Sequence, residues 1–248
     1  MPTTATARIL AFIDAGVKIL QVDLPSSEAW AAGLSHLLSP DERERARRYR
    51  FERDRSRFVV SRVALRSALS AWLSVEPEEI VFDNRCRRCS KAHGKPSVVG
   101  AGPPFDFSLS RSGDLALIGI GTVGPLGVDV ERVDTTVVTA EVVRSALSEN
   151  EAADLPSNGC ERAQRFFRSW ARKEAYAKAT GYGLGIPLPD INFVPGGEDD
   201  FVVASGRRGF AGRVRDLEPR LGYVAAVGQL DVELGPVRPE EGMFIPSC

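Results

Sequence analysis

The chain has 248 residues, of which 43% are hydrophobic and 26% are charged, a composition typical of soluble globular domains. Its formal net charge of −1 gives no overall basic excess that would favour nucleic acid or an anionic membrane surface. Four scattered cysteines in a chain of this length exclude a disulfide scaffold.

The N-terminal segment 8–20 is apolar but short, and Asp14 and Lys18 interrupt it. Such a segment does not cross a bilayer and lacks the layout of a signal peptide. We therefore expect a cytoplasmic protein that binds neither membrane nor nucleic acid. Alternation of apolar residues over 17–24 predicts the first strand.

Two helices are predicted in the basic region that follows. Ser39 as N-cap, Pro40 at the first position and acidic residues in the first turn predict a helix start. Apolar residues at helical spacing predict a second helix over 53–73. The segment 41–66 contains ten arginines and no lysine, and we interpret most of them as a solvated helix face.

The next region reads as strands separated by a long loop. A short strand is predicted at 80–83, followed by a Gly-, Pro- and Cys-containing loop over 84–104. The segments 105–110 and 115–121 are predicted as two strands, joined by the turn 111–114. Gly124 and Pro125 then form a turn before a further strand over 126–133, so the middle of the molecule lies near residues 122–125.

The second half alternates helices with strands in a similar way. Helices are predicted over 139–147, from 148 onward and over 162–180, and strands over 191–194, 201–204 and 223–230. Residues from Gly235 on are Pro-rich and are predicted to be a loose tail. Because each half contains strands and a long helix, the pattern permits two similar halves, 1–123 and 124–248.

The segment 170–183, WARKEAYAKATGYG, is the most informative part of the chain about function. Trp170, Glu174 and Lys178 are spaced four residues apart and so share a helix face. Lys173 lies beside Glu174, and glycines follow where the helix ends. This arrangement suits a phosphate and a divalent metal better than a plain solvated surface.

Two carboxylates in the strand 126–133 point to the same chemistry. Asp129 and Glu131 face the same side of a strand about 6.8 Å apart, where they repel each other unless a cation lies between them. Mg²⁺ prefers oxygen ligands of this kind, and Glu174 is a natural third ligand. The alternative is an exposed strand face with its acids solvated or paired to Arg132.

Cys86, Cys89 and His93 have partial zinc-ligand spacing without a nearby fourth ligand. A zinc ribbon that binds nucleic acid is therefore one competing hypothesis, and a loop with free thiols is the other reading. The ribbon hypothesis explains neither Asp129 and Glu131 nor the helix at 170–183.

Several motifs together resemble one family. GVDVE at 127–131 and WARKEAYAKATGYG at 170–183 are similar to the two signature motifs of the 4′-phosphopantetheinyl transferases. Gly94-Lys95-Pro96 resembles the family's GKP element, and Phe107 to Ser110 resembles its FxxSH element. The arginine-rich segment near 37–66 resembles the N-terminal half of the Sfp-type, two-lobed subfamily.

This resemblance implies a fold and a reaction. It implies an α+β fold of two similar α/β lobes in one chain, a pseudo-dimer with coenzyme A in the cleft between the lobes. The expected reaction moves the phosphopantetheine arm of coenzyme A to a serine of an acyl or peptidyl carrier protein. It releases adenosine 3′,5′-bisphosphate and depends on Mg²⁺. Because one chain supplies both halves, a monomer is expected.

The resemblance also assigns catalytic roles. Asp129, Glu131 and Glu174 would hold the metal, while Lys178 would contact the diphosphate and protonate the leaving phosphate. Lys173 would add a further positive donor to the coenzyme's phosphates. Glu174 and Glu151 are both candidates for the base that takes the serine proton, and the alternative for Glu151 is a first-turn helix acid.

Further residues are expected to bind the coenzyme. The family has histidine after Ser110, where this chain has Arg111, and a guanidinium suits phosphate binding but not proton transfer. The resemblance therefore places Arg111 at the 3′-phosphate beside Ser110. The remaining expected contacts are Arg45 and Arg57 at the same phosphate, and Gly94, Lys95 and Pro96 beside the adenine. Arg62 is a weaker candidate.

Two other functions use the same carboxylates. A Mg²⁺-dependent phosphohydrolase would need no carrier protein, and a relative that binds carriers without catalysis would need no metal ligands. The presence of all three proposed ligands argues against the second.

Overall fold

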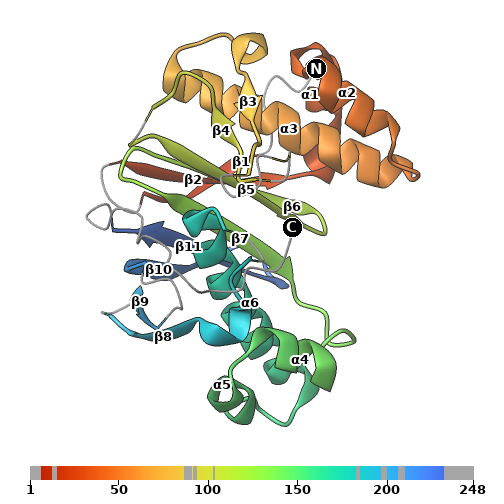
Figure 1. The fold of residues 1–248 in the computed structure, drawn as a ribbon. Coiled ribbons are helices and arrows are strands. Elements are labelled where there is room, and N and C mark those ends of the chain that lie inside the picture. The colour runs from red at the N-terminus through yellow and green to blue at the C-terminus, as the bar shows by residue number, and fades with distance from the viewer. Residues whose placement is uncertain are drawn as a thin grey trace.

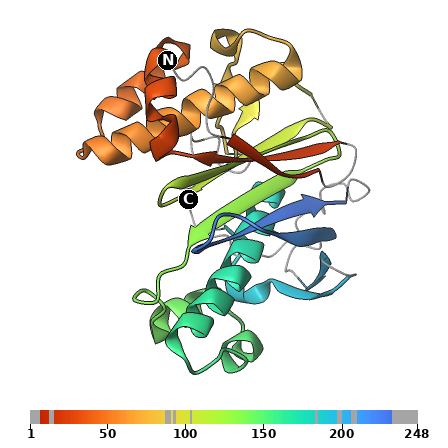
Figure 2. The ribbon, with the colours of Figure 1, turned by 180° about the vertical axis from the view of Figure 1, so that it is seen from behind.

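Two antiparallel sheets lie face to face between two layers of helices in the computed structural model of the protein (Figures 1 and 2). The structure describes residues 7–12, 16–86, 91, 94–102, 104–182, 185–196, 200–205 and 210–231. Helices α1 to α3 cover the outer side of the first sheet, and α6 covers the outer side of the second (Figure 1).

The first sheet has four strands in the order β1-β2-β6-β5. Their bounds are β1 Ala7–Phe12, β2 Val17–Asp23, β5 Asp106–Ser112 and β6 Leu115–Gly121. β6 is buried along its whole length, as expected of a strand with one sheet face on helices and the other on a second sheet. The two-stranded ribbon of β3 (Phe82–Asp83) and β4 (Ser97–Val98) lies apart from this sheet.

The second sheet has five strands in the order β7-β11-β10-β9-β8. Their bounds are β7 Leu126–Arg132, β8 Asn192–Pro195, β9 Asp200–Ser205, β10 Gly212–Leu217 and β11 Tyr223–Leu230. Apolar side chains of both sheets meet in one core, to which β2 and β6 contribute from one side and β7 and β11 from the other. β7 is an edge strand, and β5 is the edge strand of the first sheet.

Six α-helices complete the described fold. Their bounds are α1 Glu28–Gly33, α2 Pro40–Arg47, α3 Glu52–Leu73, α4 Ala140–Ala146, α5 Glu149–Ala153 and α6 Gly159–Thr180. Each half contains one helix of 22 residues, α3 or α6. None of the helices in the described part of the chain combines the length and apolar character needed to cross a bilayer.

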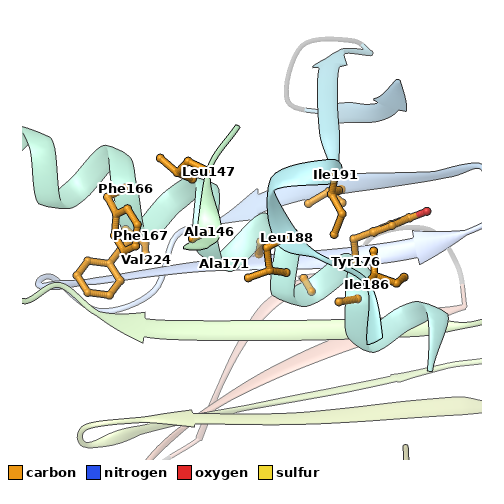
Figure 3. Packing of buried hydrophobic residues seen from close by; sticks show 14 of the residues in the cluster. Ala146, Leu147, Phe166, Phe167, Ala171, Tyr176, Ile186, Leu188, Ile191 and Val224 are labelled. Atoms are coloured by element: carbon orange, nitrogen blue, oxygen red, sulfur yellow. The ribbon is translucent and has the colours of Figure 1, made fainter. Parts of the chain in front are cut away.

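Helix α6 has one face built mainly of small residues. Ala171, Ala175 and Ala179 are buried against the second sheet, which allows the helix backbone to approach the strands closely. Larger residues fill the rest of this core, including Phe166 and Tyr176 (Figure 3). The helix ends at Gly181, which has a φ of 73° and so occupies the left-handed conformation that glycine adopts without strain.

A buried ion network holds α2 against α3. Ser39 and Glu42 form a capping box at the start of α2. The Glu42 carboxylate also accepts hydrogen bonds from Arg62 (2.6 Å) and Arg66 (2.7 Å) on α3. Arg66 is 1% exposed and donates to the carbonyl oxygens of Pro77 and Ile80. Glu42 therefore neutralises a cation that water does not reach.

The structure confirms the predicted α+β fold. The predicted helix start at residue 39 and the long helices over 53–73 and 162–180 are present as α2, α3 and α6. Three strands, β1, β4 and β10, were not predicted, and β4 lies within the segment 84–104 that was predicted to be a loop. The division of the chain into lobes 1–123 and 124–248 stays a prediction, and the predicted tail from Gly235 lies outside the described residues.

Removal of the Glu42 charge should destabilise the fold. Glu42→Gln leaves the buried Arg66 without its carboxylate, and breaking a buried pair in this way costs about 3–5 kcal/mol of the free energy of unfolding. Urea unfolding at pH 7 measures this loss. Glu44→Gln, which removes an exposed acid two residues along the same helix, should change the free energy of unfolding by less than about 1 kcal/mol. Equal stability of wild type and Glu42→Gln would contradict the assignment.

The effect should also depend on pH. Burial alone would raise the pKa of Glu42, but Arg62, the Ser39 N–H group and Arg66 together hold this pKa below its ordinary value of 4.5. The stabilisation is therefore complete above pH 4.5 and is lost as the pH falls through the lower folded-state pKa. The stability difference between wild type and Glu42→Gln should shrink in that acidic range.

Candidate active site

Strand β7 presents Gly127, Asp129 and Glu131 on the side facing α6. A Cβ atom at Gly127 would lie 2.0 Å from the Ala175 carbonyl oxygen and 2.5 Å from the Ala179 nitrogen. Glycine is therefore required at residue 127 for α6 to rest directly on the strand. This close contact places the α6 side chains at the level of the two carboxylates that follow in β7.

Asp129 is buried and carries the closest contact between β7 and α6. It is 2% exposed, and its Oδ1 atom accepts hydrogen bonds from Lys178 Nζ (2.6 Å) and Ser110 Oγ (2.7 Å). Lys178 Nζ also lies 3.0 Å from Ser110 Oγ. The other carboxylate oxygen, Oδ2, is buried and has no hydrogen-bond partner among the described residues. β5, β7 and α6 thus meet at one buried carboxylate.

Glu131 and Glu174 lie in the same electrostatic field. Burial, and next the charge of Asp129, raises the pKa of Glu131 to about 7. Burial, followed by the charge of Asp129, also raises the pKa of Glu174. Burial raises the pKa of Asp129 too, against the opposing effect of Lys178. Three carboxylates therefore share one nearby ammonium, so the site favours an additional cation.

The donor set fits a hard divalent cation. All three acidic side chains offer carboxylate oxygens, the ligands that Mg²⁺ prefers, and the unpartnered Oδ2 of Asp129 is available for coordination. In the described part of the chain, no three acidic, histidine or cysteine side chains are already spaced to hold a metal ion. In this arrangement the Lys178 ammonium supplies the positive charge beside Asp129.

Lys173 points away from this site. It is 0% exposed, and its Nζ atom donates to Glu151 Oε2 (2.5 Å) and to the Ala146 carbonyl oxygen (3.0 Å). One residue step turns a helix by about 100°, so Lys173 and Glu174 face different neighbours. The expected phosphate contact of Lys173 is replaced here by an ion pair that joins α6 to α5.

Glu151 is occupied in the same way. Its Oε2 atom accepts hydrogen bonds from the N–H and hydroxyl groups of Ser148 in a capping box at the start of α5, besides the contact with Lys173. These donors hold the carboxylate in a helix-capping role. The structure thus places Glu151 with Lys173 and not with the carboxylates around Lys178.

Arg45 and Arg111 converge on one aromatic ring. The guanidinium carbon of Arg45 lies 5.4 Å from the Phe58 ring centroid, and that of Arg111 lies 5.5 Å from it. Phe58 is itself buried on α3, so the ring holds side chains from α2 and β5 near each other. Two guanidinium groups at one place suit the binding of a phosphate.

A hollow of about 560 Å³ opens on the α2 side of the arginine pair. Its lining residues are Asp41, Glu44, Arg45, Arg48 and Tyr49. Tyr49 packs against Phe58, with ring centroids 5.4 Å apart. Two lining residues of the hollow, Arg45 and Tyr49, thus contact the Phe58 ring.

The other arginines predicted to bind phosphate have internal partners. Arg57 is paired with Asp114 on the β5–β6 turn and lies near Asp54. Arg62 belongs to the Glu42 network and lies over the Phe82 ring, 4.6 Å from its centroid. Both guanidinium groups are largely neutralised by carboxylates, so their geometry stabilises the fold.

Lys95 reaches into the junction between the sheets. Its Nζ atom donates to the Leu126 carbonyl oxygen (2.6 Å) and contacts the Asp106 carboxylate. Gly94 fits tightly against the backbone of Arg85, since a Cβ there would lie 2.6 Å from the Arg85 carbonyl oxygen. The segment of Gly94, Lys95 and Pro96 thus runs beside the start of β7.

Apart from Ser110, the polar side chains along one side of β5 were not predicted as part of the site. They bind the free N–H groups at the edge of β7 and form what we call the β5 ladder. Each rung of the ladder is one hydrogen bond from a β7 N–H group to a β5 side chain. Asp106 accepts from Leu126 N (2.7 Å), Ser108 from Val128 N (3.0 Å) and Ser112 from Arg132 N (3.0 Å). The sequence signal is the alternation in DFSLSRS, whose apolar residues Phe107 and Leu109 pack toward α3 while the polar residues between them face β7.

The proposed zinc ligands are only partly described. Cys86 lies in the described chain, whereas Cys89 and His93 fall outside it. The zinc-ribbon hypothesis and the free-thiol reading therefore both stay untested.

The chain matches two sequence models of one family. The model described as "4′-phosphopantetheinyl transferase superfamily" matches residues 125–226, and the model described as "4′-phosphopantetheinyl transferase, N-terminal" matches residues 24–121.

Curated relatives agree with these matches. The chain is 36% identical over 172 residues to the 4′-phosphopantetheinyl transferase HetI of Nostoc sp., covering 68% of this chain and 70% of the relative. It is 27% identical to the 4′-phosphopantetheinyl transferase Sfp of Bacillus subtilis, covering 70% and 73% of the two chains. An L-aminoadipate-semialdehyde dehydrogenase-phosphopantetheinyl transferase of Xenopus laevis is 28% identical, covering 68% of this chain and 57% of its own.

A side chain at residue 127 should disrupt the contact of β7 with α6. Gly127→Ala places a methyl group against backbone atoms of α6, and we expect a loss of about 1–3 kcal/mol or more in the free energy of unfolding. Gly33→Ala is the control, because nothing lies within 4 Å of a Cβ at that position. Thermal and urea unfolding measure both variants. A Gly127→Ala protein as stable as wild type would show that the helix does not rest on the strand here.

Proposed function

The chain belongs to the 4′-phosphopantetheinyl transferase superfamily, as an enzyme of the Sfp type, and we propose that it transfers the phosphopantetheine arm of coenzyme A to a serine of an apo carrier protein. Adenosine 3′,5′-bisphosphate is the second product. The observation that carries this proposal is the meeting of Asp129, Lys178 and Ser110 where β5, β7 and α6 join.

Mg²⁺ is the proposed cofactor, held by Asp129, Glu131 and Glu174. When bound, it would neutralise the coenzyme's diphosphate and polarise its phosphorus–oxygen bonds. The shortage of positive charge among these carboxylates supports this assignment, as does the free Oδ2 of Asp129. Cation binding would also compete with Lys178 for Asp129 and so make the ammonium available to the diphosphate.

The reaction requires one proton to be taken and one charge to be neutralised. The carrier serine oxygen attacks the phosphorus next to the pantetheine, and the bond from that phosphorus to the adenosine-side phosphate oxygen breaks. We assign the serine proton to Glu174, because Glu151 is occupied by Lys173 and Ser148. Lys178 steadies the diphosphate and protonates the departing phosphate.

The coenzyme's adenosine end is proposed to lie near the first sheet. Arg45 and Arg111 over Phe58 would bind the 3′-phosphate, with Arg111 serving where the family has histidine. Ser110, between this pair and Lys178, would lie beside the diphosphate. The Gly94, Lys95 and Pro96 segment would border the adenine through its backbone, since the Lys95 ammonium points to Leu126.

The acceptor is proposed to be an acyl or peptidyl carrier protein, and the working unit a monomer. Both halves of the proposed site come from one chain, which supports this assignment. A cytoplasmic enzyme without nucleic-acid or membrane partners stays our expectation.

Loss of a proposed cation ligand should abolish transfer. Asp129→Asn and Glu174→Gln keep the side-chain shapes and remove the charges, so we expect at least about a hundredfold lower turnover with the fold retained. Mass spectrometry of an apo carrier incubated with enzyme, coenzyme A and Mg²⁺ measures a gain of about 340 Da, the mass of the arm.

The exposed Glu218→Gln serves as control for these variants. Near-wild-type turnover in Asp129→Asn or Glu174→Gln would refute the cation assignment. Release of phosphopantetheine without a carrier, and no gain of mass across several acyl and peptidyl carriers, would indicate the hydrolase instead.

Arg111 should act on coenzyme binding and not on turnover. Removing a charged hydrogen bond to phosphate costs about 1.5–3 kcal/mol, so Arg111→Ala should raise the KM for coenzyme A roughly tenfold or more. With coenzyme A that lacks its 3′-phosphate, wild type and Arg111→Ala should have the same KM. Arg53→Ala, at an exposed arginine, is the control. An equal penalty with both coenzymes would place Arg111 elsewhere.

A further inference from the structure

Ser112 differs from the other rungs of the β5 ladder. Asp106, Ser108 and Ser112 each accept an N–H group of β7. The Ser112 hydroxyl in addition donates to Glu131 Oε2 at 2.7 Å. A hydroxyl has a single proton, so this proton is committed to the carboxylate while the oxygen is held by the Arg132 N–H group.

Glu131 depends on this contact for its orientation. Among the described residues, Ser112 provides the one hydrogen bond that Glu131 receives. The nearby charges of Asp129 and Glu174 repel it, and a glutamate side chain has three rotatable bonds to lose on ordering. Without a fixed donor, the carboxylate would swing away from its acidic neighbours.

Asp129 is held in a parallel way. Ser110, two residues before Ser112, donates to Asp129 Oδ1, and Lys178 adds a second donor. Two successive serines on one side of β5 thus each orient one of two successive acids on one side of β7. Within the described part of the chain, Glu131 has no ion pair comparable to the Lys178 contact of Asp129, so its serine carries more of the positioning.

We propose that Ser112 is a positioning residue, which holds Glu131 in the orientation needed to bind the divalent cation. This inference rests on the cation site of the proposed function. It assigns to Ser112 a role that Ser108 lacks, although both serines are rungs of the same ladder. Groups that orient a metal ligand in this way typically change metal affinity by about 10–100-fold when removed.

Direct cation binding separates the two serines. Mn²⁺ binding to the purified full chain is measured by the electron paramagnetic resonance signal of free Mn²⁺, and transfer is measured over a range of Mg²⁺ concentrations. Ser112→Ala should weaken Mn²⁺ binding roughly tenfold or more and raise the Mg²⁺ needed for half-maximal transfer. Ser112→Thr keeps the hydroxyl and should restore both values.

Ser108→Ala is the matched control, because it loses the same kind of rung without touching an acid. It should lower the free energy of unfolding and leave Mn²⁺ affinity unchanged. Equal Mn²⁺ affinity of wild type and Ser112→Ala overturns the proposal, as does an equal loss in Ser108→Ala.

Failure of this inference is distinct from failure of the proposed function. A wild-type chain that modifies carriers but binds no Mn²⁺ overturns the cation role of Glu131 and the role of Ser112 with it. Loss of Mn²⁺ affinity confined to Ser112→Ala and rescued by threonine supports the role whether or not a carrier is modified.

Discussion

The structure depends on how the backbone groups of β7 find hydrogen-bond partners on the two sides of the strand. One side pairs with β11 as an ordinary antiparallel strand, and the other has no strand beside it in its own sheet. Backbone N–H groups left unpaired in a buried position are costly, and the side chains of β5 satisfy them. This constraint brings the edge of the first sheet against the edge of the second and thereby assembles a polar site from both.

The same junction concentrates negative charge where water is scarce. Burying a carboxylate is unfavourable unless it is paired, and Lys178 pairs directly with one of the acids at this place. The buried acid Glu42 is paired with more positive charge. Glu42 lies between two arginines. The acids around Asp129 are thus less fully paired than Glu42, whose ion pairs hold α2 against α3.

Local signals in the sequence were enough to predict the long helices, whereas the α+β fold was predicted from the resemblance of the motifs to one family. The Ser39 cap and the helical spacing of apolar residues act within a few residues, so they are readable without tertiary information. β10 was missed because Asp216, which pairs with Arg172 of α6, interrupts the apolar alternation of the strand. Strand periodicity placed Asp129 and Glu131 on one face, and helix periodicity placed Glu174 and Lys178 on another, but the direct contact of Asp129 with Lys178 was not predicted. The partners of Lys173, Arg57 and Lys95 lie far along the chain, and no local pattern reveals them.

The β5 ladder also makes the stability of each sheet depend on the other. If one sheet unfolded, the edge strand of the other would lose its hydrogen-bond partners. Each exposed edge strand is then a template for pairing with other chains. Unfolding of the two halves is therefore expected to be cooperative, as one thermodynamic unit instead of two independent ones. A chain cut near residue 124 would yield fragments prone to self-association, so the covalent continuity of the two halves protects the protein against aggregation.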